Sequence, residues 1–355
     1  MPKNIVVFSD GTAQEGGKGK NTNIYKMFNM IEDRTSNQIS FYDAGVGTGW
    51  RKLTGSIGGA GISRNIRQAY AFIHENFEVG DSIYLFGFSR GAATVRSLSA
   101  LIHHFGILPK SRPELIKKAY RIYRKKDKGK VKRRAAELVA RNHTMWTRIE
   151  FIGCYDTVAA LGLSWHLPSK LIDRIPGLRH RFHDLTLSES VVHARHALAI
   201  DDERKTFLPE LWAEKLPKVD QTMAQVWFAG MHTDVGGGYL EKGLGDVSLA
   251  WLVDEAVNKG LRIYSRHPYE IEPDPHGIMH NSRSKLWTKI YRREVRSWPA
   301  ERKDRPVVHG SVLKRVGRPD PPGDMPYPRW ILERDHLVAA WDPAAYSYLK
   351  STHEN

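Results

Sequence analysis

Residues 82–98 read SIYLFGFSRGAATVRSL. The short apolar run 83–86 predicts a buried strand, and within 92–101 apolar residues recur at helical spacing. A G-x-S-x-G motif, residues 87–91, joins the two, so a strand, a sharp turn and a helix follow one another directly. On such a turn Ser89 stands clear of the sheet, and a glycine on each side lets strand and helix approach closely. The stretch therefore predicts a serine nucleophile on an elbow.

The motif also has a simpler interpretation, in which Ser89 only caps the helix that follows. That interpretation leaves both glycines and the buried strand unexplained. Outward from the motif, segments with the patterns of strands and of helices alternate along the chain: 4–8, 23–33, 39–42, 62–77, 149–154, 225–229 and 248–259. This alternation predicts an α/β fold of the α/β-hydrolase type, with a three-layer, mostly parallel sheet.

The chain length of 355 residues, 41% of them hydrophobic, is sufficient for one large α/β domain with an ample core. We expect a catalytic domain over residues 1–265, with a helical insertion at about 112–148. After residue 265 the composition shifts to Pro, Arg, His and Trp with little periodicity. Residues 266–355 are therefore predicted to be an extension that packs on the catalytic domain.

The single cysteine, Cys154, excludes an internal disulfide framework and fits a reducing compartment. The sequence has no secretory leader pattern and no run of about 18 apolar residues, so we expect a cytoplasmic protein that only a secretion system would export. The formal net charge of +15 favours anionic partners. Among these we expect a lipid surface rather than nucleic acid; the sequence indicates no oligomeric state.

The insertion carries much of this charge. Residues 117–134 contain eleven lysines and arginines, opposed by Asp127 alone. Tyr120, Ile122 and Tyr123 alternate with the basic residues, a pattern that favours contact with an anionic membrane. The alternative interpretation is a solvated helical hairpin, because charge runs are usually solvated.

A serine nucleophile requires a base, and an acid that orients the base. In α/β-hydrolases these residues follow the serine in the order acid then histidine, each at the carboxyl end of a strand. Asp156 follows the predicted strand 149–154, and His232 follows the predicted strand 225–229. Ser89, Asp156 and His232 are therefore the predicted catalytic residues, in a mechanism that needs no cofactor and no metal.

Three other histidines meet fewer of these conditions. His193 and His196 lie in an apolar stretch and are interpreted as structural. His309, in the extension, is a candidate for lining the pocket.

The oxyanion that forms in acyl transfer needs backbone donors. The N–H of Arg90 begins the helix after the serine and is one predicted donor. Asp10-Gly11-Thr12 ends the first predicted strand, where Gly11 or Thr12 would supply a second donor. Asp10 would fix this loop, or is a plain turn residue.

Asp234 supports two interpretations. It braces the glycine turn 236–238, or it forms a His-x-Asp metal-binding pair with His232. The second interpretation leads to an alternative function, a metal-dependent phosphoesterase that uses Asp10, His232 and Asp234. A further alternative is a non-catalytic protein that binds through its basic surface.

Six segments together resemble the signature blocks of a known family: 10–12 (DGT), 21–23 (NTN), 42–48 (YDAGVGT), 87–92 (GFSRGA), 155–158 (YDTV) and 232–239 (HTDVGGGY). It is the uncharacterised α/β-hydrolase domain family that includes the Tle1-like type VI secretion phospholipase effectors. The resemblance implies an α/β-hydrolase fold, a Ser89-Asp156-His232 triad and phospholipase A activity on membrane lipids. The chain departs from the family pattern at Tyr155, where Trp is usual, and at Ala13-Gln14, where Trp-Asn is frequent.

Overall fold

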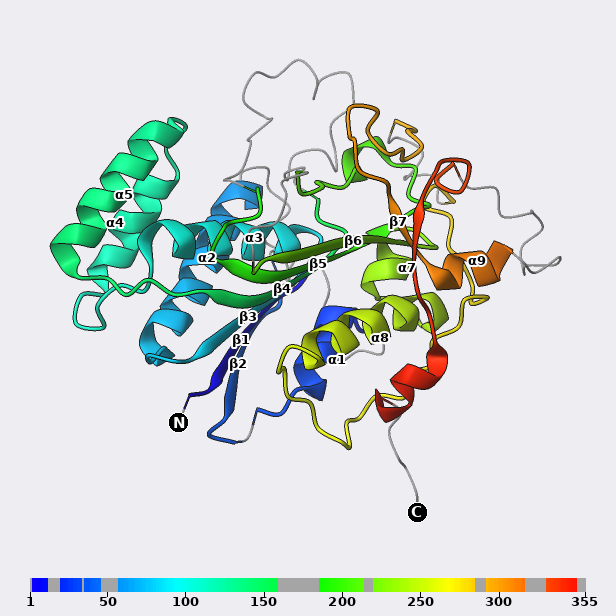
Figure 1. Ribbon diagram of the computed structural model, residues 1–355, viewed down its shortest axis with the longest axis horizontal. Coiled ribbons are helices and arrows are strands. Elements are labelled where there is room, and N and C mark those ends of the chain that lie inside the picture. Colours follow the sequence, from blue (N-terminus) through cyan, green and yellow to red (C-terminus); the bar gives the residue numbers. More distant parts are fainter. Residues whose placement is uncertain are drawn as a thin grey trace.

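Within the residues that this computed structural model describes (2–11, 20–33, 35–45, 57–158, 185–213, 220–284, 292–316 and 330–349), eight strands form one sheet in which every neighbouring pair is parallel. Its order is β2-β1-β3-β4-β5-β6-β7-β8 (Figure 1). The strands are β1 (Asn4–Ser9), β2 (Gln38–Asp43), β3 (Ser82–Phe88), β4 (Ile149–Tyr155), β5 (Val191–Ala199), β6 (Thr222–Phe228), β7 (Val307–His309) and β8 (Leu337–Ala339).

Helices cover both faces of this sheet. The helices of the described residues are α1 (Asn23–Met30), α2 (Ile57–Asn76), α3 (Arg90–Phe105), α4 (Glu114–Tyr123), α5 (Lys128–Asn142), α7 (His232–Gly236), α8 (Gly243–Val257) and α9 (Gly310–Val316), with short 3-10 turns η2 (Lys205–Phe207) and η4 (Pro343–Leu349). On one face α2 and α3 pack on the sheet through a core that includes Ile66, Leu98 and Leu85. On the other, α1 and α8 pack through Met27, Phe86 and Leu252. The predicted three-layer α/β fold is confirmed.

The central strands are buried on both faces, as parallel strands between two helical layers must be. In β3 every residue after Ser82 is buried, and all residues of β4 except Glu150 are buried. Because all strands run the same way, their carboxyl ends meet at one edge of the sheet. Loops that follow β1, β3, β4, β5 and β6 therefore converge there, and this edge holds the predicted catalytic residues.

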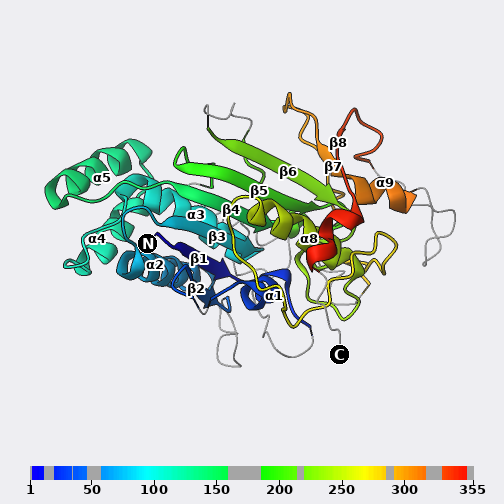
Figure 2. The ribbon, with the colours of Figure 1, turned by 60° about the horizontal axis from the view of Figure 1, so that its bottom comes forward.

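The segment after residue 265 continues the sheet, which its aperiodic composition did not predict. β7 pairs with β6 through Val226 and Val307, and β8 pairs with β7 (Figure 2). The boundary at 265 stays a prediction. The predicted helix 248–259 begins earlier, at Gly243, and it is not amphipathic. α8 is buried on nearly all sides because it lies between the sheet and the chain around η4.

The basic insertion forms the predicted helical hairpin, α4 and α5, beside the end of the sheet where the strands begin (Figure 1). All eleven basic side chains of residues 117–134 are exposed. Tyr120 and Tyr123 are only 4% and 5% exposed, and Ile122 packs against the same core. The expectation that these three residues belong to an interfacial surface was wrong: they attach the hairpin to the domain. No helix in the described part of the chain has the length and apolar character that a membrane crossing requires.

Candidate active site

Ser89 lies on a strained turn between β3 and α3. Its backbone angles are φ 58° and ψ −119°, a conformation that residues with a Cβ rarely adopt. Residues 87 and 91 must be glycines because other backbone atoms lie where a Cβ atom would be. A Cβ on Gly91 would lie 1.9 Å from the carbonyl oxygen of Ser9, and one on Gly87 would lie 2.5 Å from that of Gly91. The sharp turn between strand and helix is therefore as the motif predicts.

Backbone hydrogen bonds hold this turn. The Ser89 N–H donates to the carbonyl of Tyr155 at 3.0 Å, and the Ser89 carbonyl accepts from Ala93 at 3.3 Å. The side chain of Ser89 makes no capping hydrogen bond, so the interpretation of Ser89 as a simple helix cap was wrong. Its half-buried side chain stands at the positive N-terminal end of α3. The N–H of Arg90 belongs to the first turn, whose donors have no carbonyl partner within the helix.

Asp156 and His232 are hydrogen-bonded to each other. Asp156 directly follows β4 and is completely buried, and its Oδ2 lies 2.5 Å from Nδ1 of His232. His232 begins α7 after β6 and is 4% exposed. Its ring packs on Phe88, the residue before Ser89, with 4.7 Å between ring centroids. The structure therefore brings the predicted acid and base together, with the base against the residue that precedes the predicted nucleophile.

Arg296 completes this group and was missed in the sequence. Its two terminal nitrogens donate to the two oxygens of Asp156, at 2.7 and 2.8 Å, and also to the carbonyls of Ala199 and Phe207, at 2.5 and 2.6 Å. The Arg296 side chain is 1% exposed. It lies 140 residues after Asp156 in a stretch without periodicity, where no sequence signal distinguishes it from the other arginines.

Burial favours a neutral His232, and the cations and hydrogen bonds around Asp156 favour an ionised acid. Burial alone would raise the pKa of Asp156, but the Arg296 charge and the hydrogen bonds from His232 and Arg296 hold it well below its usual range. Burial lowers the pKa of His232, and the hydrogen bond to Asp156 opposes this shift. A second buried pair, Asp202 and Arg204, lies beside them, and Asp202 accepts the His232 N–H at 3.3 Å. His232 is thus suited to accept a proton.

Asp10 is buried at the end of β1 and fixes the loop there, so it is more than a plain turn residue. Its carboxylate accepts hydrogen bonds from Thr22 at 2.6 Å, Tyr42 at 2.8 Å and the N–H of Gly11 at 2.6 Å. Burial raises the pKa of Asp10 to about 6. Because the Gly11 N–H is bonded to Asp10, its use as an oxyanion donor would require this bond to be shared and stays a prediction. Thr12 lies outside the described residues.

Asp234 caps α7 and binds a histidine. Its carboxylate accepts from the N–H groups of Met231 and His280, each at 3.0 Å, and lies 2.6 Å from Nδ1 of His280. Asp234 therefore braces the start of α7, just before the glycine turn. Among the described residues no three His, Cys, Asp or Glu side chains are grouped around a common metal position. The structure does not bring Asp10, His232 and Asp234 together as the metal hypothesis requires.

The other candidate histidines have structural partners. His196 is fully buried in β5, and its Nε2 accepts the N–H of Thr157 at 3.0 Å. His193 bonds Thr222 at 2.8 Å. His309 is fully buried at the end of β7 and bonds Ser311 at 2.8 Å, so it is enclosed in the core instead of facing a pocket.

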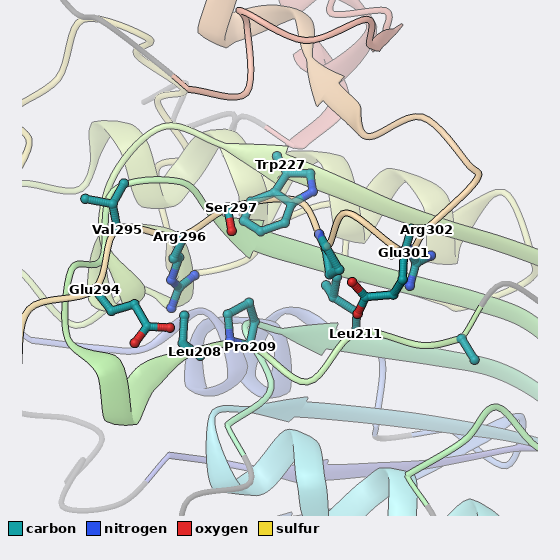
Figure 3. A pocket seen from close by; sticks show the side chains of 12 residues that line it. Leu208, Pro209, Leu211, Trp227, Glu294, Val295, Arg296, Ser297, Glu301 and Arg302 are labelled. Carbon is teal, nitrogen blue, oxygen red and sulfur yellow. The ribbon is translucent and has the colours of Figure 1, made fainter.

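A cavity of about 520 Å³ lies beside Arg296 (Figure 3). Its walls come from the chain around Leu208 and Leu211, from Trp227, and from the segment that carries Arg296 and Arg302. None of the three predicted catalytic residues lines it. Residues 165–185 are rich in Pro, Leu and His without periodicity, a pattern that favours a lid or pocket wall, but this segment lies outside the described residues except for Leu185.

The sequence of this chain matches the model of a known protein family. A family model described as "T6SS, Phospholipase effector Tle1-like, catalytic domain" matches residues 3–255. The chain belongs to this family. The resemblance of its six sequence segments is thereby confirmed, and Ser89, Asp156 and His232 all lie within the matched region of this Tle1-like chain. Since the family is one of phospholipase effectors, the chain belongs to a family of lipid-hydrolysing enzymes.

Individual relatives are more distant. The uncharacterized protein YEL023C of Saccharomyces cerevisiae is 30% identical over 233 residues, which are 58% of this chain and 32% of that protein. The crystal structure of an uncharacterized protein from Pseudomonas aeruginosa has a TM-score of 0.48 at 16% identity, with 75% of this chain and 47% of that chain covered. The Tle1 effector bound to the VgrG spike has a TM-score of 0.35 at 21% identity, with 67% and 51% covered. The chain thus spans about a third to a half of the relatives it matches.

Proposed function

We propose that this protein is a serine hydrolase that cleaves an acyl ester of a phospholipid, an activity of the phospholipase A type. The observation that carries the proposal is the hydrogen bond of 2.5 Å between Asp156 and His232, next to a serine on a strained turn. Strain of this kind is typical of functional sites, since a simple turn could be built without it. The phospholipid substrate is taken from the family, whose description names a phospholipase effector.

The reaction follows from the roles of these groups. Ser89 Oγ attacks the ester carbonyl, and Nε2 of His232 takes its proton because Nδ1 is bonded to Asp156. Asp156 orients the ring and stabilises the imidazolium. The developing oxyanion is stabilised by the N–H of Arg90 at the start of α3, with a second donor from Gly11 or Thr12. His232 returns the proton to the leaving alcohol, and water then releases the acyl group from Ser89 by the same steps.

Hydrolysis of phospholipid vesicles and of a small soluble ester by purified variants tests this proposal. Ser89→Ala, Asp156→Asn and His232→Ala are each expected to lose most activity on both substrates while their circular dichroism is unchanged. Residues of a triad act as a unit, so Ser89→Ala/His232→Ala should be little worse than either single variant. Losses that multiply would count against a shared mechanism.

His196→Ala is the matched control for the base, since His196 is a second buried histidine close to Asp156. We expect it to lower stability more than turnover per folded molecule. A folded, inactive His196→Ala variant together with an active His232→Ala variant would show that the base has been wrongly assigned.

We also propose that the α4–α5 hairpin attracts the protein to anionic lipid. Its eleven exposed cations are opposed within residues 117–134 by Asp127 alone, and Trp146, just after α5, is 63% exposed. Tryptophan is favoured at the boundary of a bilayer. The hairpin lies beside the end of the sheet where the strands begin (Figure 1), whereas Ser89 follows the carboxyl end of β3, so the hairpin would hold the protein at a membrane without delivering lipid to the serine. Delivery by a secretion system, as the family description suggests, belongs to the same proposal.

A further inference from the structure

We propose that Arg296 is a positioning residue of the catalytic centre, which fixes the Asp156 carboxylate for His232 and keeps the enzyme active into mildly acidic solution. The inference rests on the proposed function and adds a residue to it. Arg296 lies beyond residue 255, where the family match ends. The segment 292–316 therefore completes the active site as well as extending the sheet.

The contacts of Asp156 are fully used by this arrangement. Oδ1 accepts hydrogen bonds from the N–H of Ala199 at 3.1 Å and from Arg296, and Oδ2 accepts from Arg296 and lies against Nδ1 of His232. The guanidinium is planar and meets both oxygens at once, which sets the rotation of the carboxylate. Since Oδ2 is shared, any rotation of Asp156 would also move the imidazole.

Arg296 is itself held rigidly. Besides Asp156 it binds the carbonyls of Ala199, at the end of β5, and Phe207, in η2. The Phe207 ring packs edge-on against the His232 ring, with 5.1 Å between centroids. One arginine thus ties together the acid, the strand beside it and a residue that contacts the base. An arginine serving only to connect two loops would not require contact with both oxygens of the catalytic acid.

The charge of Arg296 also affects the protonation of His232, because both side chains contact Oδ2 of Asp156. A neighbouring carboxylate favours the protonated form of a histidine, and a cation paired with that carboxylate weakens this effect. Among the described residues, the other charged or titratable groups that interact with His232, Asp156 or Arg296 include Asp201, Asp202, Arg204 and His196. Burial lowers the pKa of His196 to about 3, so it is neutral. Loss of Arg296 would leave Asp156 uncompensated and would favour a protonated, inactive His232.

The pH dependence of kcat/KM on a soluble ester tests this with full-length Arg296→Met and Arg296→Lys variants. At low pH, kcat/KM falls as His232 becomes protonated, and this fall is the acid limb of the profile. For Arg296→Met we expect the midpoint of the acid limb to move to a higher pH by about one unit, the size of a lost charge interaction, and kcat to fall. Arg296→Lys keeps the charge without the planar fork, so its limb should stay near that of the wild type while kcat falls.

Arg302→Met is the matched control. Arg302 is on the same segment and also donates to a backbone carbonyl, that of Trp212 at 2.7 Å, but it does not bond Asp156. Its acid limb should coincide with that of the wild type. An unmoved limb in folded Arg296→Met would overturn the proposal, because a merely structural arginine would lower only the amount of folded enzyme.

A titration of His232 by NMR in the wild type and in Arg296→Met compares the base directly. Burial lowers the pKa of His232 in both proteins, so the proposal predicts a higher pKa in Arg296→Met than in the wild type, and an equal or lower value in the folded variant would overturn it. This outcome is separate from failure of the proposed function, which an active Ser89→Ala variant would reveal.

Discussion

The strain at Ser89 predicts an unusual order of stability between two substitutions. At φ 58° and ψ −119° a residue with a Cβ costs about 1–3 kcal/mol, a cost that glycine avoids. Glycine adds about 0.5–1 kcal/mol of conformational entropy to the unfolded chain. Ser89→Gly should therefore be more stable than Ser89→Ala by up to about 2 kcal/mol, although both remove the hydroxyl and both are expected to be inactive.

Ser99, in the interior of α3, is the matched control. It is buried, and its hydroxyl donates to the carbonyl of Arg96 at 2.8 Å, a bond that alanine and glycine both remove. At an ordinary helical position glycine is about 1 kcal/mol less stable than alanine. Urea unfolding followed by circular dichroism should thus give opposite signs at positions 89 and 99. If glycine were the less stable variant at both positions, Ser89 would not be strained and the reasoning about the elbow would be refuted.

Two further predictions concern charge. Reversing Lys117, Lys118, Arg124 and Lys125 to Glu should sharply reduce hydrolysis of anionic vesicles, since each cation near such a surface contributes about 1 kcal/mol. Hydrolysis of a soluble ester should not change, because β4 separates the hairpin from the catalytic residues: its seven residues span roughly 20 Å, more than two Debye lengths of about 8 Å. Equal loss of activity on both substrates would indicate a damaged fold. Unchanged activity on both would indicate that the hairpin is only solvated. Burial lowers the pKa of His309 to about 3, so between pH 3 and 6.5 the unfolded chain binds a proton that the folded chain does not, and stability falls with falling pH by about 1.4 kcal/mol per unit. In His309→Phe the unfolding free energy should fall less steeply between pH 7 and pH 5, because the contribution of His309 to the slope is lost. An unchanged slope would contradict the lowered pKa of His309.

Local patterns were sufficient to predict the elbow and the places of its partners. The glycines at 87 and 91 are required by contacts within a few residues or with the neighbouring strand, and Asp156 and His232 directly follow strands that are recognisable by their apolar runs. Features of this kind depend on residues that are close in the sequence, so a local pattern reveals them. For Asp10 the sequence left two interpretations open, a residue that fixes its loop and a plain turn residue, and the hydrogen bonds of its carboxylate decide for the first.

The remaining features depend on packing between distant segments. Arg296 reaches Asp156 across 140 residues, and β7 and β8 are three residues each, too short to leave a periodic signal. α8 is buried on its outer side by chain that follows it, which its own sequence does not indicate. Tyr120 and Tyr123 could have been placed correctly, because with Ile116 they recur at helical spacing and mark the buried face of α4.

Labelling with a fluorophosphonate probe tests the central claim most directly, because the probe reacts covalently with an activated serine. The wild-type protein should be labelled at Ser89, as located by mass spectrometry of the modified peptide, and Ser89→Ala should remain unlabelled while it stays folded. Labelling of Ser89→Ala to the same extent as the wild type, or no labelling of a folded wild-type protein, would contradict the assignment of Ser89 as the nucleophile.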